Sequence, residues 1–286
     1  MKHIVGFSGG ADSQATALWA RQKFPATDIV LLFSDTGWED CLTYEFIQNY
    51  SANVFQVTTV TPLVGDAGDL MLRKERAGVE RAGLAAGDVL TMERLAAIKG
   101  RWASSRAQFC TSFLKLYPQK RWMEQNIPLG EDYERYAGVR RDESKARRDV
   151  AESEWDDFFD CTLNRPLASW SKAQVFDFLA AHGEAVNPLY RMGQSRVGCS
   201  PCHNRGKDDI RKWAAYRPEE VEKVRQAEKR TGRTFFPPVV PGMVMNFIDD
   251  VVAWAKTERG GKQISLPFAE ADAASGTCSS KYGLCE

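Results

Sequence analysis

The chain has 286 residues, of which 43% are hydrophobic, so it can bury a sizeable core and is not globally disordered. Lys and Arg together number 38, as do Asp and Glu, so the formal net charge is zero. This balance excludes a general polyanion-binding protein, which carries a basic excess, and any contact with nucleic acid must come from a local patch.

The first 34 residues predict a strand, a loop, a helix and a second strand. Residues 2–7 are apolar and β-branched at their centre, residues 8–13 are typical of a tight turn, and residues 14–23 of a helix. Residues 28–34 are a near-continuous apolar run, as in a parallel strand buried on both faces. The crossover between the two strands is expected to be right-handed.

The chain changes character near residue 205, after which it is helical and highly charged, with a break at Pro218. We therefore predict a core domain over residues 1–205 and a helical C-terminal extension with a cysteine-bearing tail over residues 206–286. Residues 65–100 are interpreted as an insertion or a lid. The other predicted elements are helices over residues 41–50, 92–99, 117–125, 171–182 (with Ser171 as N-cap) and 243–257, and strands over residues 53–57 and 133–139.

The expected cellular location follows from the lack of a membrane-spanning segment and of a signal peptide. No apolar run approaches the roughly 20 residues that a membrane-spanning helix needs, and the first residues are too short for a signal peptide. We therefore expect a cytoplasmic protein with no membrane partner. There the seven cysteines stay reduced, which favours metal ligation or catalysis over a disulfide framework.

A glycine-rich loop, Ser8-Gly9-Gly10-Ala11-Asp12-Ser13, stands directly between the first strand and the first helix. Such a loop brings backbone N–H groups and the positive end of a helix to an anion, and the two serine hydroxyls can add hydrogen bonds. Asp12 would repel a bare phosphate, so it indicates a bound Mg²⁺. The loop therefore predicts a phosphate or pyrophosphate site.

The glycine-rich loop has three alternative interpretations. The Walker A pattern G-x-x-x-x-G-K-[ST] is missing. The G-x-S-x-G pattern of the hydrolase nucleophile elbow is present around Ser8, but residue eight leaves no room for the strands that precede such an elbow. A glycine-rich turn without a ligand is the third alternative, although it rarely needs Ser, Asp and Ser beside two glycines.

Several blocks, in order, resemble one family. The SGG-x-DS loop resembles the PP-loop of ATP pyrophosphatases, and residues 34–39 (SDTGWE) resemble the D-T-G-x-E segment of the phosphoadenosine phosphosulfate reductase family. The further matching blocks are Cys110-Thr111 with Lys115 and Pro118, Gly138-Val139-Arg140-Arg141-Asp142-Glu143-Ser144 with Arg147, Arg165-Pro166-Leu167 with Trp170, Asn187-Pro188-Leu189-Tyr190 and Gly198-Cys199-Ser200-Pro201-Cys202. The resemblance covers about residues 1–205.

The resemblance implies an α/β fold, a doubly wound, mostly parallel sheet of the adenine nucleotide alpha hydrolase-like type, with the nucleotide outside the carboxyl ends of the strands. It also implies roles for single residues. It assigns Ser8, Gly9, Gly10, Asp12 and Ser13 to phosphate binding, Asp35, Thr36 and Gly138 to the rest of the nucleotide site, and Asp12, Lys115, Arg140 and Arg147 to catalysis. Arg140 and Arg147 are candidate anion clamps, with a solvated helix face as the alternative.

The family contains two chemistries, one that splits ATP between its α and β phosphates and one that reduces a sulfonucleotide to sulfite. The complete loop resembles the ATP-splitting branch, which adenylates an acceptor for sulfur transfer in DNA phosphorothioation or tRNA thiolation. Thiol-type reductases end in E-C-G-[LI]-H, whereas this chain ends in KYGLCE. A reductase with Cys285 or Cys278 as nucleophile remains the second interpretation, and a non-catalytic nucleotide-binding module the third.

Cys199 and Cys202 form a C-x-x-C pair that aims two thiolates at one metal, and the family pattern adds Cys110 as a third ligand. The fourth is Cys285, Cys278 or His203. Such a set suits a [4Fe–4S] cluster or, alternatively, a structural zinc ion. Cys41 and Cys161 are interpreted as core residues.

The predicted partners are an adenine nucleotide as ATP, a DNA or tRNA acceptor, and a cysteine desulfurase as sulfur donor that docks on residues 207–231. Residues 99–149 carry 12 basic and 7 acidic residues. This stretch includes Arg101, Arg106, Trp102 and Trp122, so it predicts a basic, aromatic surface for nucleic acid.

Overall fold

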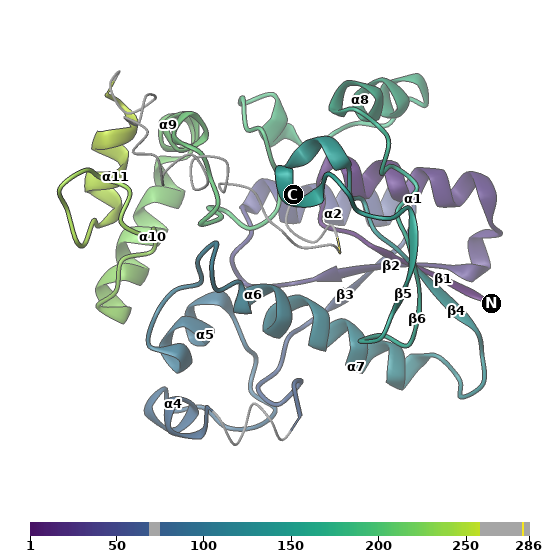
Figure 1. Cartoon of the computed structure of the whole chain (residues 1–286), viewed down its shortest axis with the longest axis horizontal. Coiled ribbons are helices and arrows are strands. Elements are labelled where there is room, and N and C mark those ends of the chain that lie inside the picture. The colour runs from purple at the N-terminus through teal and green to yellow at the C-terminus, as the bar shows by residue number, and fades with distance from the viewer. Residues whose placement is uncertain (69–74, 258–281, 283–286) are drawn as a thin grey trace.

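Six strands form one sheet in the computed structural model, which describes residues 1–68, 75–257 and 282 (Figure 1). Their order is β3-β2-β1-β4-β6-β5, and every neighbouring pair is parallel except β5 with β6. The strands are β1 (Lys2–Gly6), β2 (Ile29–Ser34), β3 (Val57–Val60), β4 (Tyr133–Tyr136), β5 (Ser153–Asp156) and β6 (Cys161–Asn164). The predicted doubly wound, mostly parallel sheet is therefore confirmed.

Helices cover both faces of the sheet because its central strands are apolar on both sides. Side chains alternate along a strand, so Val5 packs into the cluster under one layer of helices and Ile4 into the cluster under the other. The first layer contains α1 (Ala11–Lys23) and α2 (Cys41–Asn53), with α8 (Lys172–Ala181) packed on α1; the second contains α7 (Tyr117–Asn126) (Figure 1).

A second apolar core lies beyond the carboxyl ends of the strands. Trp38, Leu95, Trp213, Val224 and Ile248 are buried together there. They join the segment after β2 to the helices drawn together at one end of the molecule in Figure 1. These helices are α4 (Arg76–Arg81), α5 (Met92–Lys99), α9 (Lys207–Tyr216), α10 (Pro218–Thr231) and α11 (Ile248–Ala255). The C-terminal helices thus share a core with the segment after β2, and the domain boundary at residue 205 stays a prediction.

A short α-helix, α6 (Phe109–Thr111), continues into a π-helical turn over Ser112–Leu116 before α7 begins. π-helical turns occur often at functional sites because the extra residue re-aims side chains. This turn carries Lys115, and α6 carries Cys110. No helix among the described residues is long and apolar enough to cross a membrane.

Several predicted elements were confirmed, among them the helix over residues 92–99 and Ser171 as the N-cap of α8, whose hydroxyl accepts from the Gln174 N–H. The strand predicted over residues 53–57 was wrong. Helix α2 runs to Asn53, and the Ser51 hydroxyl accepts from the Val57 N–H at 3.0 Å, so the strand begins only there. The hairpin of β5 and β6 was not predicted.

Glu228 is a buried carboxylate that joins α10 to α11. It accepts hydrogen bonds from the backbone N–H groups of Phe235 at 2.7 Å and Ile248 at 2.8 Å, and burial raises its pKa. We predict that Glu228→Ala lowers the free energy of unfolding by about 3 kcal/mol, because two buried donors lose their acceptor. Chemical denaturation followed by circular dichroism measures this. Glu222→Ala, on the exposed face of α10, is the control, and an equal loss in both variants would contradict the assignment.

Candidate functional site

The glycine-rich loop lies between β1 and α1, where the order of strands reverses between β1 and β4. Ligands of open α/β sheets bind at such a switch point, outside the carboxyl ends of the strands. Gly9 has φ of +79°, a left-handed conformation that favours glycine. The first-turn N–H groups of α1 have no acceptor within the helix, so the loop presents donors to an anion.

The two serine hydroxyls hold the loop in shape. The Ser8 and Ser13 Oγ atoms lie 3.1 Å apart, and Ser13 Oγ donates to the Gly10 carbonyl at 2.9 Å. Ser8 Oγ accepts from the Gly10 N–H at 3.3 Å. Tyr190 adds a further contact, because its hydroxyl accepts from the Ala11 N–H at 2.9 Å. The serines therefore position the backbone of the loop.

Gly138, directly after β4, packs against the loop. A Cβ atom built on Gly138 would lie 2.6 Å from the backbone carbonyl carbon and oxygen of Asp12 and 2.8 Å from the Ser13 nitrogen. Only a glycine allows this approach, so the contact fixes the position of the loop relative to β4. The assignment of Gly138 to the nucleotide site stays a prediction, and its observed contact is with the loop backbone.

A cavity of about 250 Å³ opens beside the start of α1 and is called the nucleotide pocket here. Asp12, Arg140, Lys172, Tyr190 and Arg196 are among its lining residues. Burial, followed by the nearby Arg140 charge, lowers the pKa of Lys172. Three cationic side chains, Arg140, Lys172 and Arg196, and three carboxylates, Asp12, Asp142 and Glu143, thus line one cavity at the N-terminus of a helix, a combination that suits a phosphate-bearing ligand with a bound cation.

Asp12 and Arg140 form a buried ion pair on the wall of this pocket. The Nε atom of Arg140 donates to Oδ1 of Asp12 at 2.8 Å. Burial raises the pKa of the Asp12 carboxyl to about 6, although the Arg140 charge opposes the rise. The carboxylate is therefore ionised above about pH 6 and takes up a proton below it.

Arg147 has a different environment from Arg140. Its side chain is 1% exposed and forms an ion pair with Glu143, whose carboxylate lines the nucleotide pocket. Arg147 thus lies behind a residue of the pocket wall, and its role as an anion clamp stays a prediction.

Asp35 and Thr36 lie in the segment after β2, which contacts the cysteine segment. Glu39 is buried at its centre and accepts from the Thr36 hydroxyl at 2.6 Å and from the Tyr44 hydroxyl at 3.0 Å. Tyr44 also donates to Asp35 at 2.6 Å, and burial together with Glu39 raises its pKa. Thr36 and Asp35 are thus engaged in this network, and their proximity to adenosine stays a prediction.

The Cys199 segment pairs with this network along the backbone. The Ser200 N–H donates to the Trp38 carbonyl at 2.7 Å, and the Trp38 indole N–H donates to the Pro201 carbonyl at 3.1 Å. The Cys199 thiol lies 3.7 Å from Oε1 of Glu39, and burial raises its pKa to about 12.

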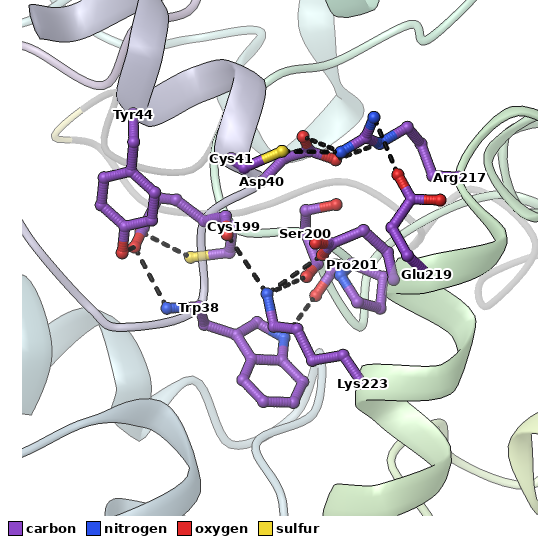
Figure 2. A network of polar contacts seen from close by, with 12 residues as sticks. Trp38, Asp40, Cys41, Tyr44, Cys199, Ser200, Pro201, Arg217, Glu219 and Lys223 are labelled. Carbon is purple, nitrogen blue, oxygen red and sulfur yellow. Dashed lines mark hydrogen bonds and ion pairs between the residues drawn. The ribbon is translucent and has the colours of Figure 1, made fainter.

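Two basic residues, Arg217 directly before α10 and Lys223 within it, contact the junction between the segment after β2 and the Cys199 segment, as Figure 2 shows. Lys223 donates to the carbonyls of Glu39 at 3.2 Å and Ser200 at 3.3 Å, so one ammonium group bridges the two paired segments. Arg217 donates to both carboxylate oxygens of Asp40, the N-cap of α2, at 2.8 and 2.9 Å.

The predicted metal ligands Cys110, Cys199 and Cys202 line one cavity of about 20 Å³, called the cysteine pocket, together with His203 and Lys115. Thiolates and an imidazole suit zinc or an iron–sulfur cluster, so the donor chemistry fits the implied group. Within residues 1–68, 75–257 and 282, no three His, Cys, Asp or Glu side chains are gathered closely enough to hold a metal ion. The predicted fourth ligands Cys285 and Cys278 lie outside the described residues.

Lys115 lies between the loop and the cysteines. It lines the cysteine pocket and also a smaller cavity of about 10 Å³ that Ser8 and Cys199 share. Its side chain is 7% exposed. A buried cation at this position suits charge that develops between a nucleotide on the loop and a group at the cysteines.

Two predictions about single residues were wrong. Trp102 was expected on a nucleic-acid surface, but it is 5% exposed and packs against Trp38 and Phe235 in the second core. Cys41 was expected in the core, but it is exposed in the first turn of α2, where its sulfur accepts from Arg217 at 3.0 Å. Cys161 is buried, as predicted.

Several residues of the site were not singled out from the sequence. Tyr190 belongs to the N-P-L-Y block, which the resemblance contained without a role for the hydroxyl. Lys172 follows the N-cap of α8, and nothing in the sequence distinguishes it from any other lysine on a helix. Glu39 belongs to the D-T-G-x-E block, which the resemblance contained without a role for its carboxylate, whereas Arg217 and Lys223 acquire their contacts only through tertiary packing.

The fold and the site together define an α/β protein with a glycine-rich loop at the switch point of its sheet and a thiol-lined cavity. The family model described as the phosphoadenosine phosphosulfate reductase domain matches residues 85–205. A stretch of the chain is also 38% identical over 68 residues to the adenosine 5'-phosphosulfate reductase of Streptomyces coelicolor. Residues 85–205 are thus similar to the phosphoadenosine phosphosulfate reductase domain.

The extent of these similarities differs. The match to the Streptomyces enzyme covers 24% of this chain and 29% of that enzyme. A protein of Escherichia phage 186, described as an uncharacterized 37.8 kDa protein in the gpa 5' region, is 30% identical over 99% of this chain and 96% of its own length. The crystal structure of phosphoadenylyl-sulfate reductase from Candida auris aligns with a TM-score of 0.47 and 18% identity, over 71% of this chain and 83% of that one.

We predict that Gly138→Ala weakens nucleotide binding by about tenfold or more, because the new methyl group meets the backbone of Asp12 and Ser13 and displaces the loop. Isothermal titration with ATP measures this. Gly206→Ala is the matched control, since a Cβ atom there meets nothing within 4 Å. Unchanged affinity in Gly138→Ala would show that the contact does not fix the loop.

We also predict that Mg²⁺-dependent ATP affinity falls as the pH drops through about 6, because the Asp12 carboxylate then takes up a proton and loses its charge for the ion. ATP titrations with and without Mg²⁺ across this range measure the effect. In Asp12→Asn the Mg²⁺ contribution should be small and independent of pH. A pH step that persists in this variant would assign the titration to another group.

Proposed function

We propose that this protein is a PP-loop ATP pyrophosphatase that adenylates an acceptor for sulfur transfer, of the DNA phosphorothioation or tRNA thiolation type. The observation that carries the proposal is the Asp12–Arg140 pair on the wall of the nucleotide pocket, beside a complete SGG-x-DS loop. A loop that supplies backbone donors, with a carboxylate and a guanidinium next to it, suits a metal-bound triphosphate.

The first step in this proposal is attack of an acceptor oxygen on the α-phosphorus of ATP. A new oxygen–phosphorus bond forms, the bond from the α-phosphorus to its bridging oxygen breaks, and pyrophosphate leaves with the electron pair. A sulfur nucleophile then attacks the acceptor atom that carries the adenylate, and AMP leaves with the acceptor oxygen.

The residues of the chain act on these steps by position and charge. The N–H groups at the start of α1 hold the phosphates, and Arg140 and Lys172 face the same pocket and stabilise negative charge there. Mg²⁺, when bound, supplies further charge neutralisation, and Asp12 would hold it. Lys115, between the loop and the cysteines, is placed to stabilise charge on the group that is transferred.

The cysteine pocket is part of the same proposal. Cys110, Cys199 and Cys202 would hold a [4Fe–4S] cluster or a zinc ion, with Cys285, Cys278 or His203 as the fourth ligand. If instead only the three cysteines bound a [4Fe–4S] cluster, its fourth iron would be open and would supply a binding site for sulfide. A cysteine desulfurase as donor, docked on α9 and α10, and a cytoplasmic location that keeps the thiols reduced complete the proposal.

A sulfonucleotide reductase that forms sulfite is the second candidate, because the similarity to adenosine 5'-phosphosulfate reductases favours it. In that case Cys285 or Cys278 is the nucleophile. Replacement of both cysteines by Ser should then abolish sulfite formation while nucleotide binding persists. Under the first proposal, the same variant still releases pyrophosphate from ATP.

We predict that Asp12→Asn lowers pyrophosphate release from Mg²⁺-ATP by about 100-fold or more, because the carboxylate that would hold the ion is lost. The assay uses anaerobically purified protein with DNA or tRNA present. Asp157→Asn, an exposed carboxylate on the β5–β6 turn, is the matched control and should retain full activity. A fully active Asp12→Asn variant would refute the proposed function.

A further inference from the structure

A larger cavity lies outside the nucleotide and cysteine pockets, between α4, α5 and α10. Its volume is about 640 Å³, against about 250 Å³ for the nucleotide pocket. Arg81, Arg94, Arg230 and Arg233 line it and come from separate parts of the chain. We call it the arginine pocket.

The charge of the arginine pocket is strongly positive, although the whole chain is neutral. Glu93 is the one carboxylate among the described lining residues, and Arg230 neutralises it through two contacts, at 2.5 and 2.9 Å. Arg81, Arg94 and Arg233 therefore have no balancing carboxylate among the described residues that line the cavity. A concave surface of this kind attracts anions.

Two of these guanidinium groups are held in place by backbone carbonyls. Arg81 Nη2 donates to the Ile98 carbonyl at 3.2 Å, and Arg94 Nη1 donates to the Val89 carbonyl at 2.7 Å. Each contact engages one of the five N–H donors of an arginine, so further donors remain for a ligand. A guanidinium fixed in this way loses less conformational freedom when it binds a phosphate oxygen.

The shape and lining of the pocket favour a polymer over a single nucleotide. Among the described residues, the lining includes no aromatic side chain on which a base would stack. The basic surface also continues beyond the pocket, because exposed Arg101 directly follows Gly100 of the lining. Repeated phosphate groups along a backbone match such a row of guanidinium groups.

The arginine pocket adjoins the cysteine pocket through α5. Met92 lines the cysteine pocket, while its neighbours Thr91 and Glu93 line the arginine pocket. The Met92 N–H also donates to the Thr36 carbonyl at 2.9 Å, which ties the start of α5 to the segment after β2. The two pockets are therefore lined by consecutive residues at the start of α5.

We propose that the arginine pocket binds the phosphodiester backbone of a nucleic-acid acceptor, independently of base sequence. This inference rests on the proposed function, in which such an acceptor is adenylated at the nucleotide pocket. It adds the surface that holds the acceptor, which lies outside the loop, the nucleotide pocket and the cysteines.

The test measures binding of fluorescein-labelled DNA oligonucleotides, single-stranded and double-stranded, by fluorescence anisotropy at several salt concentrations. Arg94→Gln with Arg233→Gln should weaken binding about tenfold at low salt. The slope of log K against log salt should become shallower by about 1.4 for the single strand, which is the loss of two phosphate contacts. ATP affinity should be unchanged.

The matched control is Lys23→Glu, an exposed basic residue at the far end of α1, which should bind the oligonucleotide like the wild type. Arginines near helix ends also stabilise helices, so the midpoint of thermal unfolding is measured for each variant. The comparison requires that the double variant is folded. Should Arg94→Gln with Arg233→Gln lower that midpoint, Arg233→Gln alone, with its expected slope change of about 0.7, replaces it.

Three results would overturn the inference: wild-type affinity and slope in the arginine variants, no oligonucleotide binding at all, or a pocket that binds tripolyphosphate but no oligonucleotide. The outcome is separable from the proposed function. Oligonucleotide binding that depends on these arginines, without pyrophosphate release, would support the pocket and refute the function. Pyrophosphate release with unaffected oligonucleotide binding in the variants would refute the pocket alone.

Discussion

The backbone pairing between the segment after β2 and the Cys199 segment is the constraint on which the site depends. A backbone hydrogen bond from Ser200 to Trp38 and a side-chain bond from the Trp38 indole to Pro201 bring residues about 160 positions apart into one antiparallel bridge. The cysteines thereby lie at the carboxyl ends of the same strands that carry the glycine-rich loop. The nucleotide pocket and the cysteine pocket are consequently neighbours, with Lys115 between them.

This junction contains buried charge, which explains its dependence on the C-terminal helices. A buried carboxylate is costly unless hydrogen-bond donors surround it. Glu39 has donors from Thr36 and Tyr44, and Asp40 has the bidentate guanidinium of Arg217. Because Arg217 and Lys223 come from α10 and the residue before it, the helices after residue 205 complete the surroundings of the cysteine segment.

The sequence predicted those parts of the fold that local patterns encode. The apolar runs of β1 and β2 and the capping serine of α8 have short-range causes, and each was placed correctly, whereas α1 begins at Ala11 and not at residue 14 as predicted. The β5–β6 hairpin escaped prediction because its strands are four residues long and Trp155 points to solvent. The exposure of Trp102 was predicted wrongly because its burial depends on packing in the second core, against residues distant in the sequence. The burial of Cys41 was predicted wrongly because the sequence does not show which side of α2 is exposed.

The residues of the site also fall into those that a local motif predicts and those that only tertiary packing brings together. Asp12 and Arg140 follow from motifs, and the structure places both of them on the lining of one cavity, whereas Ser8 lines a separate, smaller cavity. The contact of Gly138 with the loop depends on the order of the strands, which brings β4 beside β1, and Tyr190 and Lys172 reach the cavity from segments far along the chain. The arginine pocket draws its charge from three separate segments, so it shows no basic run in the sequence.

The most direct measurement for the central claim is a parallel product assay on the wild-type protein, purified without oxygen. The protein is incubated with Mg²⁺-ATP or with a sulfonucleotide, each with and without DNA or tRNA, and pyrophosphate, AMP and sulfite are quantified. The proposed function predicts pyrophosphate and AMP from ATP and no sulfite. Sulfite from the sulfonucleotide, without any turnover of ATP, would contradict it and establish the reductase chemistry.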